Sequence, residues 1–217
     1  LNTHAESMRH IIHILHSRGI GVLSVRLTGH RGSIAEMKQV SRAQWLAEVY
    51  KGFEILKRRD SEGDKPVFFF GFSLGCVVGL DAANLFYKQK EEYAYNYAVF
   101  FAPAINVRWY TRLIGGLSFL GAGFIVPSKA PEEYRANRGT SVAAYRALFD
   151  HIEAVHKAQV SVINRPTLCF IDKRDELVSI RGLEAKKKQK NLTHWKIHRA
   201  ESSEERSPPY HLLIDEY

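Results

Sequence analysis

The sequence predicts an α/β fold, in which a mostly parallel central sheet is covered by helices on both faces. Two observations lead to this prediction. Short apolar runs of strand length alternate along the chain with longer stretches of helical periodicity, a pattern typical of parallel sheets. The run Gly71-Phe72-Ser73-Leu74-Gly75 also stands where a buried strand gives way to a buried helix. With 217 residues, the chain is long enough for one domain with a substantial core.

The chain before this run predicts two helices and two strands. Residues 5–18 form a helix with one apolar face, and Gly19 ends it. A strand over Gly21–Val25 follows, and Ser41 then caps a second helix. The apolar residues of that helix recur at helical spacing and are Trp45, Val49, Phe53 and Leu56. The aromatic run over residues 66–70 is the next buried strand.

After the run, the alternation of helix and strand continues. Cys76–Phe86 is apolar on all sides, as expected of a helix in the centre of a domain. Three further strands are expected, over Tyr97–Phe101, Thr167–Ile171 and Thr193–His198. These elements complete the predicted parallel sheet.

The segment 106–164 interrupts this alternation and is predicted to be mainly helical, with its longest helix over Ala143–Val155. An insertion at the carboxyl end of such a sheet lies over the place where ligands bind. We therefore interpret 106–164 as a cap or lid, inserted into a core formed by residues 1–105 and 165–217. An ordinary helical layer without a gating role is the alternative.

Ser73 is the candidate nucleophile. A serine on a sharp turn from strand to helix presents its hydroxyl at the carboxyl end of the sheet. Gly71 and Gly75 are expected there because strand and helix pass too close for side chains. A serine hydroxyl reacts only when a base takes its proton and a third group orients the base. The alternative is a glycine-rich turn with an incidental serine.

The acid and the histidine follow the serine, in that order, in folds with this turn. Asp175 is the predicted acid because it lies in the turn beyond a strand end. Asp172 is nearer the strand, where turn hydrogen bonds are expected, and is the alternative acid. His211 is the predicted base because it follows the last strand. The other histidines lie in the first helix, the loops, the cap or the last strand: His4, His10, His13, His16, His30, His151, His156, His194 and His198.

Three segments resemble the α/β-hydrolase family, in particular its monoacylglycerol lipase and serine aminopeptidase-like branch. Leu27-Thr28-Gly29-His30-Arg31-Gly32-Ser33 resembles the P-G-H-G-x-S loop of that branch. The stretch from Arg165 to Val178 resembles its strand-and-acid segment, and Tyr210–Leu213 its histidine loop. The resemblance covers nearly the whole chain, although the cap matches only in a general way. It implies a serine hydrolase with Ser73, Asp175 and His211 as its triad.

The resemblance also implies an oxyanion hole made of two backbone N–H groups. Leu74, beside the serine, supplies one of them. Leu1-Asn2-Thr3-His4 resembles the portion just after the family's H-G turn, so Leu1 would supply the other. The glycine of that turn, the strands before it and a C-terminal helix are missing from the sequence. We therefore expect it to be a fragment, or the ordered part, of a longer chain.

The apolar cap predicts a substrate with an acyl or other apolar group rather than a charged peptide. The candidate pocket residues are Leu113, Leu117, Phe119, Leu120 and Phe124. The leading prediction is a serine ester hydrolase of the carboxylesterase or monoacylglycerol lipase kind, which acts on a small-molecule ester, including lipid-like ones. A thioesterase or an acyltransferase on the same triad is the alternative, and a catalytically silent binding module is the rival from another class. No metal and no other cofactor are expected.

The net charge of +8 favours an anionic membrane surface over nucleic acid as a second partner, since no nucleic-acid-binding signature is present. The densest basic cluster is Lys186-Lys187-Lys188-Gln189-Lys190. A basic membrane-associating protein with a secondary pocket is thus a further alternative. Cys76 and Cys169 lie in apolar runs, which predicts buried free thiols and no metal spacing. Without a signal peptide or an apolar run of ~20 residues, we expect a cytoplasmic protein, with membrane association as the alternative.

Overall fold

The computed structural model describes residues 8–30, 33–59, 65–113, 119, 121–128, 130–200, 208–211 and 213. The strands of its central sheet are β1 (Phe68–Phe72), β2 (Tyr97–Phe101), β5 (Thr167–Asp172) and β6 (Trp195–Ala200). They lie in the order β1-β2-β5-β6, and every neighbouring pair is parallel. The prediction of an α/β fold around a parallel sheet is confirmed.

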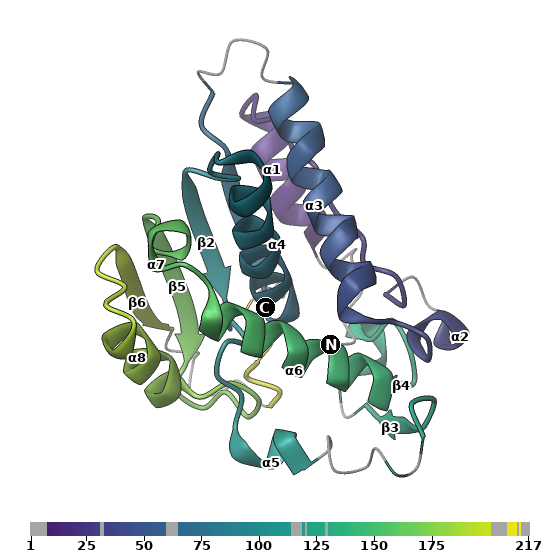
Figure 1. Cartoon of the computed structure of the whole chain (residues 1–217). Helices are drawn as coiled ribbons and strands as arrows, with labels where there is room; N and C mark the ends of the chain where they lie inside the picture. The colour runs from purple at the N-terminus through teal and green to yellow at the C-terminus, as the bar shows by residue number, and fades with distance from the viewer. Residues whose placement is uncertain are drawn as a thin grey trace.

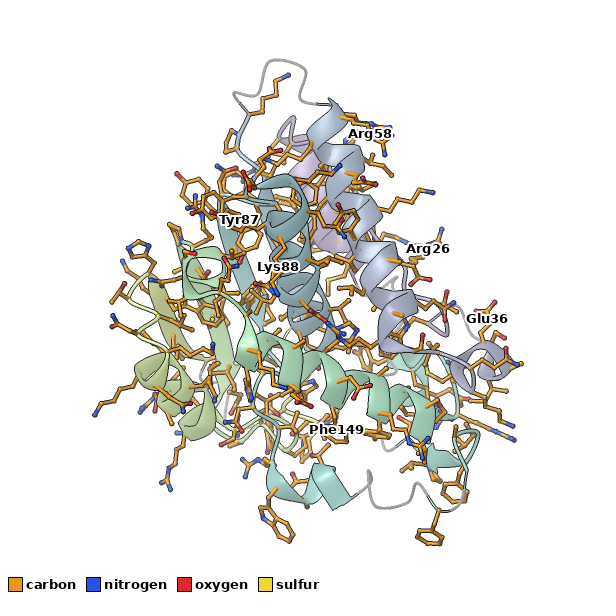
Figure 2. The ribbon with its side chains drawn as sticks, viewed as in Figure 1. Arg26, Glu36, Arg58, Tyr87, Lys88 and Phe149 are labelled. Carbon is orange, nitrogen blue, oxygen red and sulfur yellow. The ribbon has the colours of Figure 1, made fainter. Side chains whose placement is uncertain are left out.

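Helices flank this sheet (Figure 1). They are α1 (Arg9–Ser17), α2 (Ile34–Met37), α3 (Arg42–Arg59), α4 (Leu74–Lys90), α5 (Trp109–Leu113), α6 (Val142–Lys157), α7 (Val160–Ile163) and α8 (Ile180–Gln189), with a 3-10 turn η3 (Glu132–Tyr134). Helix α4 packs on β1 and is covered in turn by α3 and α6. Near the outer end of α3, Arg58 points away from the body of the molecule (Figure 2). None of the helices in the described residues is long and apolar enough to span a bilayer.

The two faces of the sheet differ in character. The face towards α4 is buried, with Phe100, Cys169 and Trp195 nearly inaccessible to solvent. A row of rings crosses the opposite face, and its members are Phe70, Phe101, Phe170 and His198, with neighbouring centroids 5.2, 5.1 and 5.4 Å apart. The core of the protein therefore lies between the sheet and α4, as expected from the apolar sequence of that helix.

Gly79 sets how closely α4 approaches the sheet. A Cβ atom at this position would overlap the ring of Phe69 on β1. The glycine thus lets the helix lie directly on the aromatic strand. This contact could not be predicted, because no local sequence signal marks which helical glycine faces a ring.

The predicted strand over Gly21–Val25 is wrong. These residues have no regular structure and are mostly exposed. Val25 lies against α3, where a Cβ at Gly52 would meet its side chain at 2.8 Å. A run of residues with high β propensity becomes a strand only when a neighbouring strand pairs with it, and no described strand pairs with this run.

The segment 106–164, named the cap segment below, starts at the carboxyl edge of the sheet, where α5 lies, and ends with α7, next to the amino end of β5 (Figure 1). It holds α5, η3, α6 and α7, but also an antiparallel pair of short strands, β3 (Ile125–Pro127) and β4 (Gly139–Ser141). The prediction of a mainly helical segment is therefore correct for its helices but did not include this strand pair. The pair was missed because each strand has three residues, and Gly139 is required because a side chain there would strike the Val126 carbonyl.

A buried polar cluster joins the cap segment to the core. Asp81 on α4 accepts hydrogen bonds from Arg42 on α3 at 2.8 and 2.9 Å, and lies 2.7 Å from Nδ1 of His151 on α6. His151 is fully buried and stacks on Trp45. Burial raises the pKa of Asp81, but the hydrogen bonds from His151 and Arg42 outweigh it and lower that pKa below its ordinary value. The carboxylate is therefore charged and links three helices.

We expect Asp81→Ala to destabilise the fold by about 3 kcal/mol at pH 7, because it leaves a buried histidine and a partly buried arginine without their partner. A carboxyl group whose pKa is lowered by folding contributes stability above its unfolded pKa of about 3.9, and loses it as the pH falls through the folded value. The difference in free energy of unfolding between the wild type and Asp81→Ala should therefore shrink as the pH falls below about 3.9. Urea unfolding from pH 7 to pH 3 measures it. Glu153→Ala, which removes an exposed carboxylate from α6, is the matched control, and an equal loss in both variants would contradict the expectation.

Candidate active site

Ser73 forms the turn between β1 and α4. Its φ and ψ angles are 47° and −111°, a conformation that L-residues rarely adopt. The turn is held by the neighbouring strand, since the Ser73 N–H donates to the Phe101 carbonyl at 2.9 Å and the Ser73 carbonyl accepts from Ala104 N–H at 3.2 Å. The serine side chain therefore lies at the carboxyl end of the sheet.

One of the two glycines around the turn is required for close packing. A Cβ at Gly71 would lie 3.0 Å from both Cα and Sγ of Cys76 in the following helix. A Cβ at Gly75 would meet nothing within 4 Å. The expectation of a close approach is confirmed at Gly71 and is wrong at Gly75, because the helix has already turned away from the strand at that residue.

His211 lies between Ser73 and Asp175. Its Nε2 is 2.8 Å from Ser73 Oγ, and its Nδ1 is 2.8 Å from Asp175 Oδ2. All three residues are buried. With Nδ1–H donating to the carboxylate, the lone pair of Nε2 faces the serine hydroxyl and can accept its proton. The structure thus brings together the three residues that the sequence analysis selected.

Asp175 is fixed by the backbone of its own turn. The N–H groups of Leu177 and Val178 both donate to Asp175 Oδ1 at 2.8 Å, which leaves Oδ2 for His211. Asp172, the alternative acid, is also buried, but it accepts from the N–H of Arg174 at 2.7 Å and pairs with the guanidinium of that residue. It therefore makes the turn hydrogen bonds that its position predicts, and Asp175 is the carboxylate that meets the histidine.

Residues 106–108, at the start of the cap segment, form further hydrogen bonds with the turn that contains Asp175. Arg108 N–H donates to the Leu177 carbonyl at 2.9 Å, and Arg108 Nε donates to the Asp175 carbonyl at 2.8 Å. The Ser179 N–H donates to the Asn106 carbonyl at 2.9 Å. Sequence reasoning missed this support, because the partners lie some 70 residues apart and no local pattern connects them.

The other predicted site residues are the oxyanion-hole candidates and the leucines of the predicted pocket. Leu74 is described and begins α4 next to Ser73, so its N–H lies at the helix N-terminus. Leu1, Leu117 and Leu120 lie outside the described residues, and Leu113 ends α5.

The two aromatic residues of the predicted pocket are exposed. Phe119 is 80% and Phe124 is 42% accessible to solvent. A hollow of about 410 Å³ lies instead beside the turn of Asp175, and is lined by Asn106, Val107, Arg108, Trp109, Tyr110 and Ser179. Trp109, which is 73% exposed, and Tyr110 were not predicted as pocket residues. Their aromatic character within the cap was the available signal.

The two cysteines are buried free thiols, as predicted. Burial raises the pKa of Cys169 to about 12, and it also raises the pKa of Cys76. Neither is therefore a thiolate at neutral pH. Within the described ranges, no group of three or more histidine, cysteine, aspartate or glutamate residues has the arrangement of a metal site.

Comparison with known proteins adds a family and a fold. Residues 1–133 match a family model described as serine aminopeptidase, S33. No curated protein is a match to the sequence.

Several solved structures superpose well. A lipolytic enzyme from work on the metagenome-derived LipS and LipT gives a TM-score of 0.75 at 20% identity, over 93% of this chain and 80% of that chain. The monoacylglycerol lipase of Paleococcus ferrophilus gives 0.66 at 18% identity, over 92% of this chain and 80% of that chain. A thioesterase domain from the curacin biosynthetic pathway gives 0.59 at 14% identity, over 100% of this chain and 84% of that chain. At these identities the superpositions show a common fold and do not choose a substrate.

Proposed function

The chain belongs to the serine aminopeptidase S33 family of α/β-hydrolases, and we propose that it cleaves carboxylic esters through an acyl-enzyme formed on Ser73. The observation that carries the proposal is the continuous hydrogen-bonded path from Ser73 Oγ through His211 to Asp175, with both donor–acceptor distances at 2.8 Å. Such a path is the arrangement in which a histidine activates a serine.

In the proposed reaction, Ser73 Oγ attacks the ester carbonyl carbon while His211 Nε2 takes the hydroxyl proton. Asp175 keeps the imidazole in the required tautomer and stabilises its charged form. The tetrahedral intermediate then expels the alcohol, which receives the proton from His211. A water molecule, deprotonated by the same nitrogen, attacks the acyl-enzyme, releases the acid and restores Ser73.

The oxyanion of the intermediate needs N–H donors that are already in place. Leu74 offers its N–H from the first turn of α4, where the helix dipole also favours negative charge. The second donor is assigned to Leu1 on the family resemblance. Each such donor typically contributes about 10²- to 10³-fold in kcat.

The substrate is proposed to carry an apolar acyl or alcohol group, held under the cap segment. Support comes from the exposed aromatic side chains Trp109, Phe119 and Phe124 of this segment. Rings of this kind cover apolar ligand surface and lose little entropy on binding. Thioester hydrolysis uses the same machinery and is the alternative, while contact with an anionic membrane is retained only as a prediction.

We expect kcat/KM on p-nitrophenyl esters to rise from acetyl to medium acyl chains, and then to level off as the pocket fills. Each methylene that leaves water should contribute about 0.8 kcal/mol, or roughly fourfold in kcat/KM. Phe119→Ser should blunt this chain-length preference more than it lowers acetyl ester hydrolysis. Kinetics on a C2 to C12 ester series, with the matching thioesters, measure both effects.

Phe68→Ser is the matched control, because Phe68 is 60% exposed but lies on β1 at the opposite end from Ser73. It should leave the chain-length profile unchanged. A flat profile in the wild type, or equal losses from Phe119→Ser on short and long esters, would leave the cap segment without a role in substrate binding.

A further inference from the structure

His211 lies in the described stretch of residues 208–211, which follows the last strand β6 in the chain. We name it the histidine loop, and we name residues 172–176 the acid turn. Two contacts join Tyr210, the neighbour of His211, to the acid turn, in addition to the hydrogen bond between His211 and Asp175. The proposed reaction uses neither contact, so each needs a separate explanation.

The first contact fixes the backbone beside the histidine. Glu176 Oε2 accepts a hydrogen bond from the Tyr210 N–H at 3.1 Å. Glu176 follows Asp175 directly in the chain, and its side chain is half-buried. Two consecutive carboxylates therefore bind two consecutive residues, with Asp175 on the imidazole of His211 and Glu176 on the backbone before it.

The second contact fixes the side chain beside the histidine. The guanidinium carbon of Arg174 lies 4.0 Å from the centre of the Tyr210 ring. The guanidinium is itself oriented by Asp172, with both nitrogen–oxygen distances at 3.3 Å, and Asp172 is only 1% exposed. A buried carboxylate thus holds the cation over the ring, which is the favourable geometry for a cation–π contact.

We propose that Glu176 and Arg174 are positioning residues, which hold the histidine loop so that His211 Nε2 stays within hydrogen-bond reach of Ser73. This inference rests on the proposed serine hydrolase function. Proton transfer requires close approach of the two atoms, and a displacement of about 1 Å can lower the rate about 100-fold. Asp175 alone fixes one end of the imidazole, whereas Glu176 and Arg174 fix the chain that carries it.

The central test compares Glu176→Ala with Glu176→Gln. Alanine removes the acceptor for the Tyr210 N–H, whereas glutamine keeps an oxygen in the same place. On a p-nitrophenyl ester, we expect Glu176→Ala to lower kcat about 10- to 100-fold with KM nearly unchanged. Glu176→Gln should restore kcat to within about threefold of the wild type. Glu184→Ala, which breaks the surface ion pair between Glu184 on α8 and Arg199 on β6, is the control and should match the wild type.

A double-mutant cycle tests Arg174. If Arg174 acts through the Tyr210 ring, Arg174→Ala should lower kcat several-fold in the wild type, and much less in a Tyr210→Leu background. Equal, additive losses in the two backgrounds would contradict this route. Thermal unfolding of each variant separates a loss of positioning from a loss of fold.

A second readout needs no substrate. The Nδ1–H proton of His211, which is bonded to Asp175, should give a far-downfield proton resonance, and Glu176→Ala should broaden or shift it while Glu176→Gln should not. The positioning role is overturned if Glu176→Ala keeps wild-type kcat and an unchanged resonance, or if glutamine is as damaging as alanine. A wild type that hydrolyses no ester, yet shows the resonance and its response, would instead overturn the proposed function.

Discussion

Ser73→Ala is expected to lower kcat for p-nitrophenyl ester hydrolysis by about 10⁴- to 10⁶-fold. The variant has no hydroxyl to form the acyl-enzyme, so only the oxyanion donors and substrate binding accelerate the reaction. The fold should survive, because alanine is smaller than serine and the backbone of the turn is held by hydrogen bonds to Phe101 and Ala104. Steady-state kinetics, with circular dichroism and thermal unfolding as controls, measure both statements.

Wild-type turnover in Ser73→Ala would contradict the assignment of the nucleophile. A variant that is inactive but unfolded would fail the control rather than support the assignment. Ser73→Gly should behave like the alanine variant in kinetics. It should also relieve the strain of the positive φ, because glycine adopts that region freely.

Asp175→Asn is expected to lower kcat by about 10⁴-fold, far more than Asp172→Asn. An asparagine can present its amide N–H groups to His211 Nδ1, which favours the wrong tautomer and turns the Nε2 proton towards Ser73. Asp172→Asn leaves the hydrogen bond between Asp175 and His211 intact, and it weakens only the hold on Arg174. The pair of variants is its own matched control, since each exchanges one buried carboxylate for an amide.

Steady-state kinetics of the two asparagine variants on the same ester measure the order of the effects. If Asp172→Asn is the more damaging change, the acid has been misassigned. Near-equal losses with a lowered melting temperature in both would point to a general loss of structure in the turn.

The site could be predicted where its signals are local in sequence. Ser73 lies between a strand run and a helical run, and Asp175 and His211 each follow a strand, so these positions together with chain order were enough to select them. The contacts that hold the loops around Ser73, His211 and Asp175 could not be found in this way. Arg108 meets Asp175, and Glu176 meets Tyr210, across long separations that only the fold closes.

The fold shows the same division between local and long-range information. Helix α4 was predictable because its sequence is apolar on all sides, and the structure buries most of it. The run Gly21–Val25 has the composition of a strand, but no described strand pairs with it. The β3–β4 pair could not be predicted, because each strand has only three residues and the two are brought together by the fold.

Labelling with a fluorophosphonate probe, followed by peptide mass spectrometry, tests the central claim most directly. The probe forms a covalent bond with a serine only where a base activates it, so it needs no knowledge of the natural substrate. We expect a single adduct on Ser73 in the wild type, no adduct in Ser73→Ala, and strongly slowed labelling in His211→Ala. An adduct on another residue, or equal labelling of the wild type and Ser73→Ala, would contradict the account.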